Sequence, residues 1–66
     1  MKNRLKVERA EHNLSQNELA DRIGVSRQTI NSIETGRYVP STILALKLAQ
    51  VFAKPVEAIF SLEETD

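Results

Sequence analysis

The sequence predicts an all-α fold built from five short helices. Apolar residues recur with a helical period along almost the whole chain, serines stand at three N-cap positions, and glycine or proline separates the segments. The 66 residues suffice for one small domain, residues 1–66, and the absence of cysteine excludes a disulfide framework. Area scaling gives a folded surface of roughly 4,200 Å², with about 60% of the unfolded surface buried. Such a core is marginal and favours a partner chain.

The first two helices follow from apolar spacing and from one capping motif. The spacing suggests a first helix over about residues 3–12. Ser15 and Glu18 form a capping box, in which each side chain bonds to the backbone of the other. The second helix therefore begins at Gln16. It ends at Gly24, because glycine most readily takes the left-handed conformation that follows a helix.

The remaining three helices follow from two more caps and a proline. Ser26 caps a third helix that begins at Arg27 and ends before Gly36. Ser41 caps a fourth helix, which carries a wide apolar stripe. Pro55 suits the first turn of a helix and opens a short fifth one.

No pattern in the chain suggests an enzyme or a metal site. A nucleophile with its base, a carboxylate pair or a metal cluster would be needed, and none is recognisable. Glu63, Glu64 and Asp66 are interpreted as a frayed acidic tail. His12, the only histidine, is interpreted as a helix-end residue. We therefore predict no catalytic residue, no metal and no cofactor.

The chain also lacks the features of a targeted or membrane protein. Its basic start is followed by mixed charged sequence and not by an apolar segment, so no signal peptide is expected. The longest apolar-rich stretch, residues 42–53, contains Lys47 and is far short of the ~20 residues that span a bilayer. A cytoplasmic location without a membrane partner is predicted.

Residues 16–34 combine two short capped helices with a tight turn at Gly24. This is the arrangement of a helix-turn-helix, whose second helix enters the major groove of DNA. Arg27 can donate two hydrogen bonds to guanine, Gln28 can pair with adenine, and Thr29 can meet a thymine methyl or a phosphate. Taken singly, such side chains are ordinary solvated surface. Their place in a capped helix after a glycine turn favours DNA contact.

Residues 14–41, LSQNELADRIGVSRQTINSIETGRYVPS, resemble the phage repressor/Cro (XRE) helix-turn-helix family at nearly every patterned position. With the flanking helices, the resemblance covers about residues 3–60. It implies a five-helix lambda-repressor-like domain that binds double-stranded operator DNA as a homodimer. The whole chain is similar to short stand-alone regulators of this family, which implies a prokaryotic protein associated with the nucleoid. No small-molecule effector is expected.

The resemblance also implies roles for individual positions. The positions that face bases are Arg27, Gln28, Asn31 and Ser32. The positions that meet the DNA backbone are Gln16, Thr35, Arg37 and Tyr38, and Thr29 joins them because its hydroxyl can reach a phosphate. Arg9 and Glu34 match a partly buried salt bridge between the first and third helices. Glu8 stands where close relatives often carry leucine, which bears on how tightly the first helix packs.

The end of the chain is the candidate dimer interface. Relatives of this length dimerise through the fifth helix and its surroundings, which here contain the apolar residues Val56, Ile59, Phe60 and Leu62. The alternative that these side chains simply close the core of one chain stays open. Some relatives also pair their terminal strands, and residues 2–4 and 59–62 are the segments that can do so here.

The distribution of charge is compatible with nucleic acid although nine basic residues balance nine acidic ones. Residues 1–40 hold seven basic and five acidic side chains, whereas residues 41–66 hold two and four, so the halves carry +2 and −2. We therefore predict a transcriptional regulator, a repressor bound to a palindromic operator. The alternative is a protein-interaction adaptor or antitoxin-like module with the same fold, which a basic and polar third helix disfavours.

Overall fold

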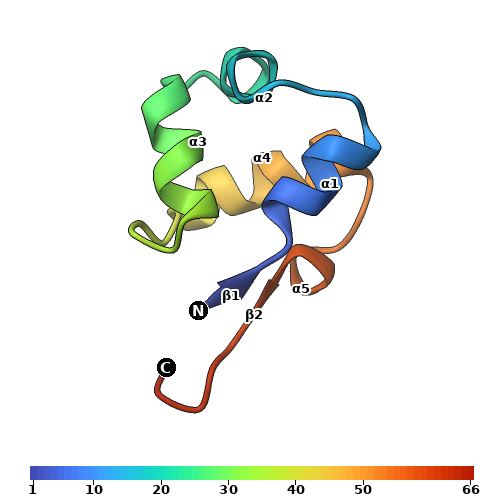
Figure 1. Ribbon diagram of the computed structural model, residues 1–66. Helices are drawn as coiled ribbons and strands as arrows, with labels where there is room; N and C mark the ends of the chain where they lie inside the picture. Colours follow the sequence, from blue (N-terminus) through green and yellow to red (C-terminus); the bar gives the residue numbers. More distant parts are fainter.

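The computed structural model describes all 66 residues and has the predicted architecture of five helices and a small terminal sheet. The elements, in chain order, are β1 (Lys2–Asn3), α1 (Leu5–Glu11), α2 (Gln16–Ile23), α3 (Arg27–Glu34), α4 (Thr42–Phe52), α5 (Val56–Ile59) and β2 (Phe60–Ser61). Figure 1 shows β1 and β2 side by side, with both chain termini at the end of the molecule opposite α2. None of the helices is long and apolar enough to cross a bilayer.

The helix boundaries are set by the local hydrogen bonds that the sequence predicts. Ser15 Oγ accepts from the backbone N–H of Glu18 at 3.0 Å, and Glu18 Oε1 accepts from the backbone N–H of Ser15 at 3.0 Å. Ser26 and Ser41 cap α3 and α4 in the same way, and Gly24 ends α2 at a φ of 73°. Each such cap stabilises the fold by about 1 kcal/mol.

The capping box makes stability depend on pH. The pKa of Glu18 lies below its ordinary value of 4.5, chiefly because its carboxylate accepts the Ser15 backbone N–H. Because the folded-state pKa is depressed, this contribution is complete above the unfolded value and is lost as pH falls through the folded value. Acidification is therefore expected to lower the free energy of unfolding of the wild type more than that of Glu18→Gln. The glutamine side chain can still form the capping box, but it does not titrate. Urea unfolding above and below pH 4.5 measures the difference, and equal losses would contradict the prediction.

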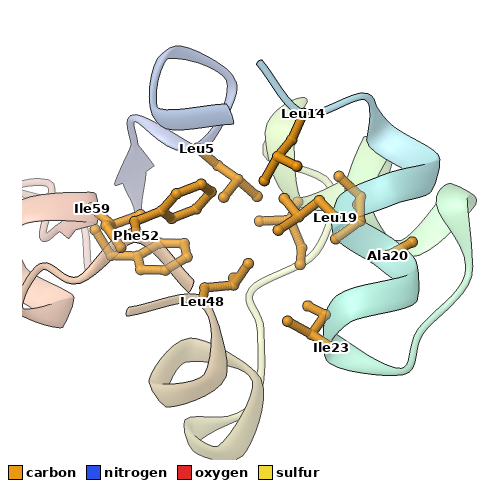
Figure 2. Close-up of a cluster of buried hydrophobic side chains, with 11 residues drawn as sticks. Leu5, Leu14, Leu19, Ala20, Ile23, Leu48, Phe52 and Ile59 are labelled. Carbon is orange, nitrogen blue, oxygen red and sulfur yellow. The ribbon is translucent and has the colours of Figure 1, made fainter. Parts of the chain in front are cut away.

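One apolar core joins all five helices and the second strand. Leu5 of α1, Leu19 of α2 and Leu48 of α4 point into the same cluster (Figure 2). The buried apolar residues are Leu5, Leu14, Leu19, Ala20, Ile23, Ile30, Ile33, Leu48, Phe52, Ile59 and Phe60. The folded surface of 4433 Å² is close to the value that chain length predicts, so the core is as small as expected.

The two terminal strands pair antiparallel, with Lys2 opposite Ser61 and Asn3 opposite Phe60. The Asn3 side chain donates to the carbonyl oxygen of Ile33 at 3.0 Å and accepts from the backbone N–H of Leu5 at 3.1 Å. This one residue therefore connects β1 to the start of α1 and to the last turn of α3. The sheet is shorter than the segments predicted for it.

The acidic tail is not frayed, contrary to expectation. The Met1 ammonium lies 3.2 Å from Asp66 Oδ1 and 3.3 Å from Glu63 Oε1. Asp66 also accepts the backbone N–H of Glu63 at 2.8 Å, which lowers the pKa of its carboxyl. The hydrogen bond to Asp66 is the main reason that the pKa of the terminal ammonium is raised. These groups are exposed, so the pairs position the tail and add little stability.

Glu8 does not loosen the first helix but forms a buried ion pair. Its side chain is 1% exposed, and Lys54 Nζ, just beyond α4, donates to Oε2 at 2.8 Å. The same ammonium lies 2.7 Å from Oε1 without hydrogen-bond geometry, so this second oxygen is paired by charge alone. Arg4 Nε is the next cation, 4.0 Å away. The pair ties α1 to the end of α4.

Candidate nucleic-acid interface

The turn between α2 and α3 orients α3 so that one of its faces is exposed to solvent. Gly24 and Val25 both direct their backbone N–H groups at the carbonyl oxygen of Ala20, which closes the turn. Ala20 is small and buried, so the two helices approach closely at this point. Ile30 and Ile33 bury the inner face of α3. The opposite face is left to solvent.

The base-facing positions implied by the resemblance lie together on this exposed face of α3. Arg27, Gln28 and Asn31 are exposed and Ser32 is half-buried. A hollow of about 330 Å³ is lined by Gln16, Arg27, Gln28 and Asn31. A second hollow of about 320 Å³ is lined by Ser26, Gln28, Thr29, Ser32 and Tyr38. Gln28 belongs to both, so α3 presents a continuous polar ridge with a hollow on either side.

The residues expected at the DNA backbone flank this ridge. Gln16 opens α2 beside Arg27, and Thr29 hydrogen bonds Ser26 Oγ at 3.0 Å through its hydroxyl. Beyond α3, Gly36 has a φ of 78°, and the backbone N–H groups of Arg37 and Tyr38 bond the carbonyl oxygen of Ser32 at 2.9 and 3.2 Å. The loop is therefore held against the end of α3.

Two of these flanking residues differ in what they can offer a phosphate. The Thr35 hydroxyl donates to the carbonyl oxygen of Asn31 at 2.9 Å and to that of Ser32 at 3.3 Å. Its proton is therefore used to close α3. Arg37 is exposed and makes no ion pair with any acidic residue of the chain. Its guanidinium is available to an anion from outside.

Arg9 and Glu34 form an ion pair that anchors the end of α3. Arg9 Nε lies 2.7 Å from Glu34 Oε2, and Arg9 Nη2 lies 3.4 Å from Oε1. Arg9 Nη1 also donates to the carbonyl oxygen of Leu14 at 2.9 Å. The two side chains are 17% and 4% exposed, so little solvent screens the pair. It links α1, the loop before α2 and the last turn of α3.

The candidate dimer residues do not share one environment. Ile59 and Phe60 lie in the core of the single chain, and their side chains are not free to contact a partner. Val56 is half-buried, while Leu62 is 79% exposed. The structure adds three exposed apolar residues that the sequence reasoning missed, namely Val39, Ile43 and Leu46. For Ile43 and Leu46, the signal was the width of the apolar stripe on the fourth helix, which exceeds what one buried face needs. Val39 lies in the loop before this helix, and the stripe does not indicate it.

Two capped helices meeting at a glycine turn, the second with an exposed polar face, define a helix-turn-helix protein. The helix-turn-helix family model matches residues 5–59. The chain belongs to the XRE-type helix-turn-helix family, as its motif predicts.

Relatives align with this chain over most or all of its length. An uncharacterized HTH-type transcriptional regulator of Methanocaldococcus jannaschii is 53% identical over 66 residues, which are 100% of both chains. Another, of Bacillus subtilis, is 48% identical over 64 residues, 97% of each chain. The ImmF control region 10 kDa protein of Bacillus phage phi105 is 42% identical over 45 residues, covering 68% of this chain and 50% of the phage protein.

Proposed function

We propose that this protein is a sequence-specific transcriptional repressor that binds a palindromic operator as a homodimer in the cytoplasm, with α3 in the major groove. The observation that supports the proposal most strongly is the polar ridge on α3, where Arg27, Gln28 and Asn31 are exposed together. Membership of the helix-turn-helix family supports DNA binding and a regulatory role, and the family is typically non-enzymatic. A dimer bound across a promoter excludes the polymerase from it.

Each part of the interface has a distinct task in this proposal. Arg27 and Gln28 are at the start of α3, and the N-terminal residues of a recognition helix are the ones that contact base edges. Arg37 in the loop beyond α3 binds a phosphate beside the groove. Both amide protons of Gln16 are used within the chain, so the phosphate contact expected of Gln16 is assigned instead to the backbone of the first turn of α2. The N-terminus of α2 adds unpaired backbone N–H groups, which favour an anion.

The dimer surface that we propose is an apolar face formed by Val39, Ile43, Leu46 and Leu62. All four are exposed, and Val39 and Leu46 line a hollow of about 230 Å³ whose other apolar lining includes Met1, Val56 and Phe60. Contiguous exposed apolar residues typically mark a contact surface. The chain measures 32 × 23 × 20 Å, so two copies side by side are large enough to hold their α3 helices ~34 Å apart, one turn of DNA.

Leu46→Glu is expected to dissociate the dimer while leaving each chain folded, because Leu46 is 53% exposed and its replacement stays in water. Sedimentation over a range of concentrations measures the mass, and circular dichroism monitors the fold. Lys47→Gln, one residue along α4, makes the same change in net charge away from the apolar face and should remain dimeric. Phe60→Glu, by contrast, should unfold the chain because Phe60 is buried. A Leu46→Glu variant that is still dimeric would exclude this surface.

Gel retardation with promoter fragments in modest salt tests DNA binding itself. The proposal predicts that a few fragments are retarded and that the complexes weaken as salt is raised, because bound counterions are released from the phosphates. If a correctly folded protein retarded none of the fragments, the result would favour the adaptor or antitoxin-like alternative.

A further inference from the structure

A chain of five polar side chains connects α1 with the exposed ridge of α3. It begins at the Arg9 and Glu34 ion pair and continues through Gln16, whose Nε2 donates to Glu34 Oε1 at 3.1 Å. The same Nε2 donates to Asn31 Oδ1 at 3.3 Å. On its other side, Gln16 Oε1 accepts from Arg27 Nε at 3.3 Å. Gln16 therefore touches both Arg27 and Asn31 from the neighbouring helix.

The hydrogen-bond direction in this chain is fixed by its charged members. Glu34 can only accept and Arg27 can only donate, so the Gln16 amide must turn its nitrogen to Glu34 and its oxygen to Arg27. The second proton on that nitrogen then points at Asn31, which must present its oxygen. Glu34 is 4% exposed and paired with Arg9, so the acceptor that sets this order is itself held by an ion pair.

We propose that Gln16 is a positioning residue that leaves Arg27 and Asn31 as hydrogen-bond donors toward DNA, so that both select guanine. The inference rests on the proposed function and adds the base class that two positions of the half-site take.

Of Arg27 and Asn31, Asn31 is the one whose base preference the hydrogen bond to Gln16 changes most. A free asparagine pairs with adenine by donating to N7 and accepting from N6. Here Oδ1 is turned toward Gln16, from which it accepts, so the amide NH₂ group is the end of the side chain that is turned toward the groove. Guanine offers two acceptors, O6 and N7, whereas cytosine offers the N4 donor, which opposes another donor. Asn31 is therefore expected to favour guanine over adenine.

The hydrogen bond to Gln16 also determines which donors Arg27 offers to DNA. Its Nε is bound to Gln16 Oε1, so its two terminal nitrogens face the groove. These are the donors that form a bidentate pair with guanine N7 and O6. Because Gln16 also holds the guanidinium in place, less side-chain freedom is lost on binding.

The test begins with the wild-type operator and a panel of duplexes in which each base pair of the half-site is replaced in turn. The position of Asn31 is the one at which Asn31→Ala loses discrimination. There the wild type is expected to bind guanine about 5- to 150-fold more tightly than adenine, the range of one well-formed base contact. Gln16→Ala should bring this ratio toward one, because the Asn31 oxygen is freed to accept from adenine. Asn17→Ala, the exposed neighbour of Gln16, should leave the ratio unchanged.

The wild-type ratio does not depend on whether Gln16→Ala folds, and circular dichroism reports the fold of each variant. A wild type that prefers adenine at the Asn31 position would overturn the inference and leave the proposed function standing. So would a Gln16→Ala variant that weakens all duplexes alike, since Gln16 would then contact only the backbone. An Asn31→Ala variant with unaltered discrimination at every position would also overturn it. If no operator exists, the proposed function fails and the inference fails with it.

Discussion

Replacing Lys54 with methionine is expected to lower the free energy of unfolding by about 2–3 kcal/mol. Glu8 is 1% exposed, so the substitution leaves a buried carboxylate without the ammonium that lies 2.7 and 2.8 Å from its oxygens. The estimate is below the full cost of breaking a buried pair because Lys54 is 39% exposed and Arg4 remains 4.0 Å from Glu8. A domain of this size has roughly 3–10 kcal/mol in total, so the loss is large.

Urea unfolding at neutral pH measures this loss, and two further variants show its cause. Lys47→Met removes an exposed lysine of α4 that makes no ion pair and should change stability little. The double variant Glu8→Leu with Lys54→Met removes both charges and should recover most of the stability, because apolar side chains replace a buried ion pair at little cost. If Lys54→Met proved no more harmful than Lys47→Met, the pair would contribute nothing to stability.

Replacing Arg27 with alanine is expected to weaken operator binding by about 1–3 kcal/mol and to relax the sequence requirement at the base pair that it contacts. Gln28→Ala should have a similar effect at the adjacent position. Arg37→Ala serves as the comparison, because a phosphate contact should weaken all duplexes alike and lower the salt slope by about one. Fluorescence anisotropy with the operator and a scrambled duplex at several salt concentrations separates the two behaviours. Unchanged operator preference in both Arg27→Ala and Gln28→Ala would show that α3 is not the recognition helix.

The boundaries of α2, α3 and α4 were predictable because they depend on contacts between residues close in sequence, whereas α1 has no side-chain cap and begins at Leu5, two residues later than expected. The Ser15 and Glu18 capping box spans three residues, and Gly24 ends its helix through its own backbone conformation. The exposed face of α3 was predictable for a related reason, since Ile30 and Ile33 fix which side is buried. Local chemistry and the helical period were sufficient for these features.

The features that sequence reasoning missed depend on partners that are distant in the chain. Glu8 and Lys54 are 46 positions apart, and no local pattern pairs them. Apolar spacing predicts that a side chain is covered but not by which chain. The sequence therefore leaves open whether Ile59 and Phe60 face a partner or close the core of one chain, and the structure buries both in that core. The hydrogen bonds of Gln16 likewise join helices across 11 to 18 positions, and their direction follows only once Glu34 is located.

Selection of bound duplexes from a random oligonucleotide pool tests the central proposal most directly. A dimer that reads DNA through paired α3 helices should enrich an inverted repeat with half-site centres about 10 base pairs apart. The enriched bases should change at single positions when Arg27 or Gln28 is replaced by alanine. A pool that shows no enriched sequence after repeated rounds with folded, dimeric protein would contradict the proposal that this protein is a sequence-specific DNA-binding regulator.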